Sequence, residues 1–397
     1  MELKKYKLGD IGKIVTGKTP STNKKANYSG ATIPFYTPED VAKGFTMMNN
    51  NKRFISSIGF DEIKNNTLDG ESVLVGCIGS DMGNVSYSNI KCATNQQINS
   101  ITQFKKGIEP LYVYYLLSTK KEYFRQLAGS TTTPLLPKSV FEKIEIYLPN
   151  ELTQKKVVSI LYNLDQKIAL NRQINQNLEE MAKQLYDYWF VQFDFPNEEG
   201  KPYKSSGGKM VYNPKLKCEI PESWECTSLG LFSEVKRGTT ITKAQTVEGN
   251  IKVVAAATTF SFLHNEANRS DYVITISASG ANAGCINFWR EPIYASDCST
   301  IQCDKIEKTL HCYYWIKHFQ EMLYNQQIGA AQPHVYPEHI NKISIIVPPQ
   351  QLLDKISPLL VSINEQQKEL NIEIENLTQH RDELLPLLMN GQVSVAE

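Results

Sequence analysis

Several features that would each indicate a class of protein are missing from this sequence. None of the apolar runs in its 397 residues approaches the length of about 20 residues that a membrane-spanning helix needs. The opening residues, MELKK, are not followed by an apolar stretch of signal-peptide length. We therefore expect a cytoplasmic protein. The chain is also too long for one ordinary hydrophobic core, so two or more domains are expected.

The cysteines do not indicate a metal site or a redox motif. The eight of them include no C-x-x-C pair. The tightest Cys/His group, Cys298, Cys303, His311 and Cys312, fits no common zinc spacing. We expect reduced, mostly buried thiols and no bound metal.

The chain has no excess of either charge, with 42 Lys and Arg against 42 Asp and Glu. Proteins that bind nucleic acid are more often basic. The charge is uneven, since residues 1–149 carry 19 basic against 13 acidic side chains and residues 350–397 carry 3 against 8. Any tight hold on DNA phosphates must therefore be shared with a partner.

The sequence does contain an internal duplication, which is the most informative feature to look for. Residues 8–19 (LGDIGKIVTGKT) recur as residues 229–240 (LGLFSEVKRGTT), with apolar residues and glycines in register. Further matches follow in the same order: residues 73–75 with 273–275, 83–87 with 284–288, and 143–149 with 342–348. The chain is therefore predicted to be two copies of one unit.

Within each copy, strand-like runs alternate with helix-like ones. Residues 109–127 and 308–327 are predicted to be helical, with Tyr112, Tyr115, Leu116 and Phe124 on one core-facing stripe. Each copy is therefore predicted to contain a mixed α/β domain.

The last segment of each copy carries the spacing of a coiled coil. Apolar and amide residues step by three and four from Val157 to Leu185, and the pattern returns from Ile356 to Leu384. The predicted seam residues are Val157, Leu161, Leu164, Ile168, Asn175, Leu178, Leu185, Ile356, Leu360, Ile363, Gln367, Leu370, Ile374, Leu377 and Leu384. A helix of about 39 residues would span roughly 58 Å.

The predicted order is domain, long helix, linker, domain, long helix. The corresponding boundaries are residues 1–149, 150–195, 196–220, 221–349 and 350–397. The linker is polar and contains Gly and Lys, which favours a surface connection without helices or strands.

Polar seam residues bear on the direction of the helix pair. In a parallel pair Asn175 would face Ile374 and Ile168 would face Gln367, whereas in an antiparallel pair Asn175 faces Gln367. A buried polar group without a partner costs about 1–3 kcal/mol, so the antiparallel pair is predicted. It would place the two domains at opposite ends, related by a pseudo-two-fold axis, which suits two half-sites on a duplex.

One short motif is misleading. Residues 12–19 (GKIVTGKT) match G-x-x-x-x-G-K-[ST], the phosphate-binding loop of nucleotide hydrolases. That loop must follow a buried strand and open a helix, but here Ile14, Val15 and Thr16 favour a strand and Pro20 follows. The second copy lacks the first glycine and the lysine. We therefore do not expect nucleotide binding.

Polar loops after the first strand of each copy are candidates for DNA contacts, because they offer donors to phosphates and base edges. Polar stretches further along each copy join them. The candidates are Lys18, Thr19, Ser21, Thr22, Asn23, Lys24, Lys25, Asn95, Gln96, Gln97, Arg237, Thr239, Thr240, Thr242, Lys243, Ser277, Ser279, Asn282, Gln332 and His334. Ordinary solvated loops are an equally good interpretation, since polar loops occur on any surface.

Over essentially its whole length the sequence resembles the specificity subunits of type I restriction–modification systems. The resemblance rests on four stretches: residues 33–41 (IPFYTPEDV), 329–335 with 345–349 (GAAQPHV, IIVPP), 185–196 with 200–208 (LYDYWFVQFDFP, GKPYKSSGG), and 384–393 (LLPLLMNGQV). The first copy departs from the pattern, because residues 130–135 (STTTPL) replace the Gln-Pro-His type at 332–334.

This resemblance implies two target-recognition domains that read a bipartite, asymmetric DNA site in double-stranded DNA. Long helices between them would bind two methyltransferase subunits, which methylate adenine N6 with S-adenosylmethionine. Two motor-nuclease subunits, which use ATP and Mg, would join for restriction. The chain itself is expected to be non-catalytic and without a cofactor. It has no Asn/Asp-Pro-Pro-aromatic tetrapeptide and no glycine-rich dinucleotide fingerprint.

Two competing functions remain: a coiled-coil adaptor with no DNA role, and an ATP-dependent enzyme that rests only on the motif at 12–19. Duplicated domains with polar loops are better explained by split-site reading. Trp189, Phe190, Phe193 and Phe195 close the first long helix. They suit either a docking surface for a methyltransferase or anchoring of the helix on the next domain.

Overall fold

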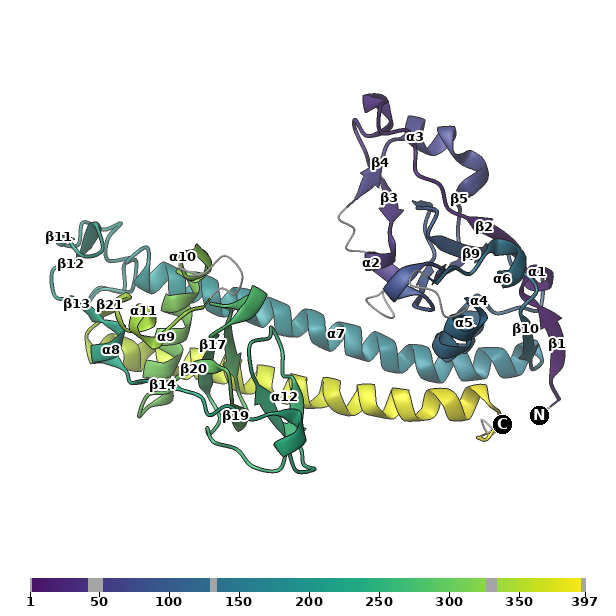
Figure 1. Cartoon of the computed structure of the whole chain (residues 1–397). Coiled ribbons are helices and arrows are strands. Elements are labelled where there is room, and N and C mark those ends of the chain that lie inside the picture. The colour runs from purple at the N-terminus through teal and green to yellow at the C-terminus, as the bar shows by residue number, and fades with distance from the viewer. Residues whose placement is uncertain (1, 42–52, 129–133, 326–333, 394–397) are drawn as a thin grey trace. The chain divides into compact units, whose positions relative to one another are not determined.

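A computed structural model describes residues 2–41, 53–128, 134–325 and 334–393. The chain divides into two compact units, each with its own sheets and short helices (Figure 1). Unit 1 comprises Met1–Leu170 and Ile374–Glu397, and unit 2 comprises Asn171–Glu373. Each of the two long helices thus contributes residues to both units.

Unit 1 is built around a four-stranded antiparallel sheet of order β2–β9–β6–β7: β2 Lys13–Thr16, β9 Ile98–Thr102, β6 Ser72–Gly76 and β7 Val85–Ser88. A second sheet has the order β4–β3–β8–β5: β4 Phe54–Ile55, β3 Ile33–Tyr36, β8 Cys92–Thr94 and β5 Thr67–Leu68, with β3 parallel to β8. β1 Lys4–Lys7 pairs with β10 Glu145–Leu148. The short helices are α1 Leu8–Ile11, α2 Pro38–Val41, α3 Ser57–Glu62 and α6 Lys138–Phe141, with the 3-10 turns η1 Lys25–Asn27, η2 Lys64–Asn66 and η3 Gly79–Asp81.

Unit 2 repeats the main sheet of unit 1, as the duplication predicted, but among the described residues its second sheet lacks a strand that corresponds to β5. Its main sheet is β14–β20–β17–β18: β14 Val235–Arg237, β20 Cys298–Ile301, β17 Val273–Ser277 and β18 Ile286–Trp289. The second sheet is β16–β15–β19: β16 Phe262–His264, β15 Ile251–Val254 and β19 Ile293–Ala295, with β15 parallel to β19. β13 Glu225–Ser228 pairs with β21 Ser344–Val347. The short elements are α8 Leu229–Phe232, α11 Pro337–Asn341, η4 Lys243–Gln245 and η5 Gly280–Asn282.

Strand β6 is buried along its whole length because it separates two cores. Val73 and Val75 pack in a cluster with residues of the helix that follows the sheet, such as Tyr115. Leu74 packs on the other face with Tyr36 of the second sheet. Successive strand side chains point to opposite faces, so one short apolar run serves both cores.

The predicted alignment of this strand was wrong by one residue. Sequence matching paired Val73 with Val273. In the structure, Val73 and Ile274 both pack on the helix side of their sheets, whereas Val273 packs on the opposite side. Val73 therefore corresponds to Ile274. A shift of one residue moves every side chain of a strand to the opposite face of the sheet. The correct alignment was hard to see in the sequence because it matches the apolar Leu74 with the polar Thr275.

The helices predicted at 109–127 and 308–327 are each broken in two. They are α4 Pro110–Ser118 with α5 Lys121–Ala128, and α9 Ile306–Lys317 with α10 Gln320–Asn325. In unit 1, Ser118 Oγ and Thr119 Oγ1 donate to carbonyls of the preceding turn, each at 2.8 Å. Such side-chain bonds compete with the helical ladder. Tyr112 and Phe124 are fully buried, as predicted for the stripe.

The two long helices are α7 Glu151–Phe190 and α12 Gln350–Met389, of 40 residues each. Asn150 caps α7, since its Oδ1 accepts from the Thr153 N–H at 2.9 Å. Gly391, with φ of 69°, follows the end of α12. All the predicted seam residues are buried or half-buried.

Within unit 2 the contacts between α7 and α12 run in opposite directions along the two helices. Asn171 Nδ2 donates to Glu373 Oε2 at 2.8 Å, and Asn175 Nδ2 donates to Asn371 Oδ1 at 2.6 Å. Gln367 Nε2 reaches the Asn175 backbone carbonyl at 3.2 Å. Asn175 thus lies opposite Gln367 as predicted, but its side chain pairs with Asn371.

The prediction that residues 196–220 form a connection without strands was wrong. They include β11 Met210–Asn213 and the start of β12 Cys218–Pro221, which pair as an antiparallel hairpin. Asn213 Oδ1 accepts from the N–H groups of Lys215 and Leu216 and so closes the turn. Ile220 is buried, which anchors the hairpin despite the polar composition around it.

The aromatic cluster at the end of α7 anchors the helix on unit 2. Phe190, Phe193 and Phe195 are buried against Trp224, and Phe195 stacks on it with ring centroids 5.3 Å apart. These three rings are therefore not available as a docking surface. Trp189 is half-buried at the edge of the same cluster.

Candidate nucleic-acid interface

In both units, candidate residues from two separate stretches meet at the same end of the main sheet. The first strand ends there, and the neighbouring strand begins. Gly17 follows β2 and donates to the Ile98 carbonyl at 3.1 Å, and Gly238 follows β14 and donates to the Cys298 carbonyl at 2.8 Å. A Cβ at Gly17 would lie 2.1 Å from Thr94 Oγ1, and one at Gly238 would lie 2.2 Å from the Ser296 carbonyl oxygen. Both positions therefore require glycine. Comparison of the two copies showed that the glycine is shared but could not show the reason.

In unit 1, two of the predicted stretches meet at this end. Thr19 Oγ1 donates to Gln96 Oε1 at 3.1 Å, and Asn95 Nδ2 donates to Gln97 Oε1 at 2.9 Å. The remaining exposed candidates of the first loop are Lys18, Thr22, Asn23, Lys24 and Lys25. The structure thus brings residues some 77 positions apart onto one polar surface.

Glu62 of α3 organises the first loop, and sequence analysis missed it. Its carboxylate accepts from the Ser21 N–H at 2.9 Å, from Lys24 Nζ at 2.9 Å and from Asn27 Nδ2 at 3.1 Å. These bonds, led by the one from Ser21, lower the pKa of Glu62 from 4.5 to about 2. Ser21 and Lys24 thus hold the loop on Glu62, with Asn27 buried beneath, while the Lys24 side chain stays 66% exposed. No local signal in the sequence links Glu62 to a loop 38 residues away.

In unit 2, Arg237 and Ser279 meet on Asp297. Arg237 Nη2 lies 3.2 Å from Asp297 Oδ1, and the Ser279 hydroxyl donates to the other carboxylate oxygen. The backbone of His334 forms a bridge to Ser279, so His334 joins the same group. The Arg237 side chain remains 46% exposed and able to reach a ligand. Sequence analysis missed Asp297, which immediately precedes β20.

The other candidates of unit 2 differ in accessibility. Thr239, Thr240, Thr242 and Lys243 are exposed, and Asn282 is half-buried in η5. Ser277 was predicted wrongly as a contact residue. It is 2% exposed in β17, and its hydroxyl donates to the Ala257 carbonyl at 3.2 Å, so it belongs to the core.

Gln332 lies outside the described residues.

The loop after β6 and β17 has the same backbone in both units. Gly79 and Gly280 have φ of 74° and 72°, and Gly83 and Gly284 have φ of 79° and 85°. These left-handed conformations favour glycine. A later segment packs on each loop, since the Leu136 N–H donates to the Cys77 carbonyl and the Val335 N–H donates to the Ala278 carbonyl, both at 2.9 Å. The frame is thus duplicated while the side chains on it differ.

The motif at residues 12–19 does not form a phosphate-binding loop. β2 occupies Lys13–Thr16 inside the motif, and residues 17–24 contain no helix. The anion-binding loop needs its glycines before a helix N-terminus. The expectation of a strand here is confirmed.

A family profile described as the type I restriction modification DNA specificity domain matches residues 1–180 and 221–376 of the chain. The match covers most of both units. The chain belongs to this family. Each unit of this type I specificity protein contains a match to the same domain, in agreement with the duplication.

Similar proteins support this assignment. The chain is 28% identical to the MjaIX specificity subunit of Methanocaldococcus jannaschii, over 98% of this chain and 93% of that one. It is 23% identical to the HindI specificity subunit of Haemophilus influenzae, over 72% and 77%. The fold resembles that of a type I S subunit from M. genitalium, with a TM-score of 0.63 at 16% identity over 98% and 96% of the two chains. The adaptor without a DNA role is not favoured.

The cysteines are free, and five of the eight are buried, as expected. Cys303 and Cys312 lie with their Sγ atoms 3.9 Å apart, while the His311 ring is held by Tyr186 and the Ile346 carbonyl. Among the described residues, no three His, Cys, Asp or Glu side chains are placed to hold a metal ion. Over the same residues, no helix combines the length and apolar character needed to span a membrane.

Proposed function

We propose that this chain gives a type I restriction–modification complex its DNA specificity, with one unit for each half of a bipartite, asymmetric site. The observation that carries the proposal is that candidate residues from two stretches of each unit meet at one sheet end, behind Gly17 and Gly238. The frames agree, but the side chains differ, since Thr16 of one corresponds to Arg237 of the other. Two domains with the same backbone arrangement but different side chains are suited to reading half-sites of different sequence.

We also propose that the chemistry belongs to partner subunits. Two methyltransferase subunits would methylate adenine N6 with S-adenosylmethionine, and two motor-nuclease subunits, using ATP and Mg, would join for restriction. The chain has no net charge, so the methyltransferases would share the hold on DNA phosphates. The role of this chain is to bind, orient and select.

The helix pair is proposed as the coiled coil that sets the unread spacer and receives the methyltransferases. A helix of 40 residues measures about 60 Å at 1.5 Å per residue. Within unit 1 the two helices border a cavity of about 680 Å³, lined by Ile160, Leu164, Leu384 and Leu387 among others. An apolar hollow of this size on a helix pair suits side chains of a partner subunit.

The test is methylome sequencing of a host that carries this gene with its cognate methyltransferase, against the same host with the methyltransferase alone. The expected result is a new N6-methyladenine mark on an interrupted motif that depends on this chain. Arg237→Ala should weaken or relax one half of the motif and leave the other half unchanged. Absence of any new mark, with both proteins expressed and folded, would refute the proposal in favour of an adaptor.

A further inference from the structure

Two cysteines of unit 2 lie in contact with each other. Cys303 follows β20, Cys312 lies in α9, and their Sγ atoms are 3.9 Å apart. A disulfide has an S–S distance of about 2.05 Å, so the two sulfur atoms would need to approach by about 2 Å. Cys312 is fully buried, whereas Cys303 is only half-buried. The pair therefore has one member that a small solute can reach.

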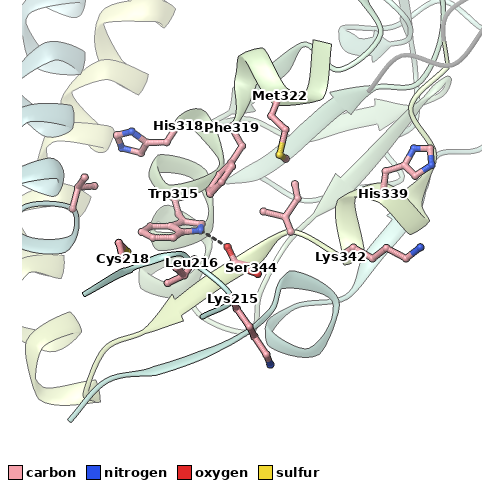
Figure 2. A pocket seen from close by; sticks show the side chains of 12 residues that line it. Lys215, Leu216, Cys218, Trp315, His318, Phe319, Met322, His339, Lys342 and Ser344 are labelled. Atoms are coloured by element: carbon pink, nitrogen blue, oxygen red, sulfur yellow. Dashed lines mark hydrogen bonds between the residues drawn. The ribbon is translucent and has the colours of Figure 1, made fainter. Parts of the chain in front are cut away.

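The contacts of α9 hold Cys312 in place. On one side of it in the helix, His311 Nε2 lies 2.9 Å from the Ile346 carbonyl oxygen. On the other side, the Trp315 indole N–H donates to the Ser344 carbonyl at 2.8 Å (Figure 2). Both carbonyls belong to β21. Because Cys312 lies between these two anchors, closure of the pair falls to the segment that carries Cys303.

The surroundings of Cys303 favour its thiolate. Its Sγ contacts Cys312 and lies 3.3 Å from the Ser233 hydroxyl oxygen, and its backbone N–H donates to Thr309 Oγ1 at 3.0 Å. Hydrogen bonds, led by the one from Cys312, lower the pKa of Cys303 from 9.0 to about 7 against the opposing effect of burial. Burial raises the pKa of the Cys312 thiol. Since the thiolate is the nucleophile, Cys303 is the member that reacts first.

The packing of α9 does not in itself require a thiol. Residues 310–316 (LHCYYWI) align with residues 111–117 (LYVYYLL) of α4, which places Val113 at the position of Cys312. Val113 is fully buried in unit 1, so an apolar side chain of similar size fills the same place in that core. α4 contains no cysteine, and the pair is a feature of unit 2.

We propose that Cys303 and Cys312 are an oxidation site, where a hydroperoxide converts the two thiols into a reversible disulfide. The Cys303 thiolate attacks one peroxide oxygen, the O–O bond breaks, and Cys303 becomes a sulfenic acid while hydroxide or alkoxide leaves. The Cys312 sulfur then attacks the Cys303 sulfur. The S–S bond forms, the S–O bond breaks, and the departing hydroxide takes the Cys312 proton and leaves as water. The two thiols lose two electrons, which the peroxide gains.

The disulfide would tie the segment after β20 to α9 in unit 2 and leave unit 1 unchanged. A thiol reductant would reverse it by exchange. This oxidation does not involve the candidate DNA contacts, and its test uses no DNA.

The test treats the folded full chain with hydrogen peroxide, blocks the remaining thiols and examines an unreduced tryptic digest by mass spectrometry. Lys305 and Lys308 separate the two cysteines into different peptides. The expected product is a linked pair of peptides that carry Cys303 and Cys312, and dithiothreitol should remove the link. In urea the same treatment should spread the links over the eight cysteines, because the fold no longer selects the pair.

Three variants assign the roles. Cys312→Val, the residue that unit 1 has at this position, should leave the sulfenic acid on Cys303 unresolved, so dimedone should label Cys303 severalfold more than in the parent chain. Cys303→Ser removes the nucleophile, so Cys312 should stay reduced. Cys218→Ser is the matched control, at an exposed cysteine of β12 in the same unit, and should leave the disulfide unchanged.

Three results would each overturn the proposal: no link between Cys303 and Cys312 under conditions that oxidise Cys218, a link no more frequent in the folded chain than in urea, or equal dimedone labelling of Cys303 in the parent and in Cys312→Val. If Cys312→Val fails to fold, the parent chain and Cys303→Ser still decide. The methylation motif can be measured with both thiols reduced, so failure here is separable from failure of the proposed function.

Discussion

The Tyr115 hydroxyl donates a 2.7 Å hydrogen bond to the buried carboxylate of Asp165, which joins the domain of unit 1 to helix α7. Burial, together with the Asp165 charge, raises the pKa of Tyr115. The repeat preserves the contact in a weaker form, since Asn364 of α12 donates to the Tyr314 hydroxyl at 3.4 Å. Each unit thus fastens a helix of its domain to a long helix through a tyrosine.

Tyr115→Phe should destabilise unit 1 by about 1.5–3 kcal/mol, because hydrogen bonds to charged groups are the stronger ones and Asp165 stays buried. Tyr314→Phe is the matched control, with an expected loss below about 1 kcal/mol, because its bond is long and its partner neutral. Urea unfolding of the two variants and the parent chain checks this. Equal losses would show that the charge of Asp165 does not matter.

A second prediction concerns the amide pair between the long helices in unit 2. Asn371→Leu removes the partner of Asn175 Nδ2, while Asn175 Oδ1 is already buried and has no hydrogen-bond partner among the described residues. The expected loss is about 1–3 kcal/mol. The double variant Asn175→Leu, Asn371→Leu should recover most of it, because two apolar residues then fill the seam.

A double-mutant cycle in urea measures the coupling. Losses that simply add would contradict an interaction between the two amides. Asn171 and Gln367 keep their own partners in every variant, so the helix direction should be retained.

The pH dependence of the first loop follows from Glu62. Its pKa in the folded chain is about 2, below the 4.5 of a free side chain, because Ser21, Lys24 and Asn27 donate to the carboxylate. Its stabilising effect is therefore full above about pH 4.5 and is lost as the pH falls from there toward 2. Glu62→Gln should lower the melting temperature at pH 7, and the difference from the parent should shrink as the pH falls through this window.

Melting curves at pH 7, 5, 4 and 3 test this behaviour. Asp61→Asn, one position earlier in α3 and exposed, is the control for loss of a negative charge. A difference between Glu62→Gln and the parent that stays constant with pH would show that the carboxylate does not hold the loop.

Periodic and repeated features of this chain could be predicted from the sequence, and long-range pairings could not. The seam around Asn175 and the strand around Val73 are local patterns, so their elements were predicted correctly. The correct alignment of Val73 with Ile274 could be found only from which face of the sheet each side chain packs on, because comparison of the two sequences does not show which face a strand residue occupies. Glu62 and Asp297 act on loops 38 and 60 residues away, and only the fold brings them there.

The last prediction concerns Arg237 as a DNA contact. Its guanidinium lies at the sheet end of unit 2, 46% exposed, with Asp297 as a screened partner that a phosphate or a base edge can replace. Arg237→Ala should weaken binding to a duplex carrying the motif found by methylome sequencing by roughly 5- to 100-fold, at unchanged melting temperature. Lys236→Ala is the matched control, because the neighbouring strand residue points to the opposite face and pairs with Glu234.

Fluorescence anisotropy at several salt concentrations separates the two possible roles of Arg237, a phosphate contact and a base contact. A phosphate contact reduces the salt dependence by about one ion and affects all sequences alike, whereas a base contact relaxes one position of the half-site. Unchanged affinity for Arg237→Ala would remove this residue from the interface and direct attention to Thr239, Thr240 and Lys243.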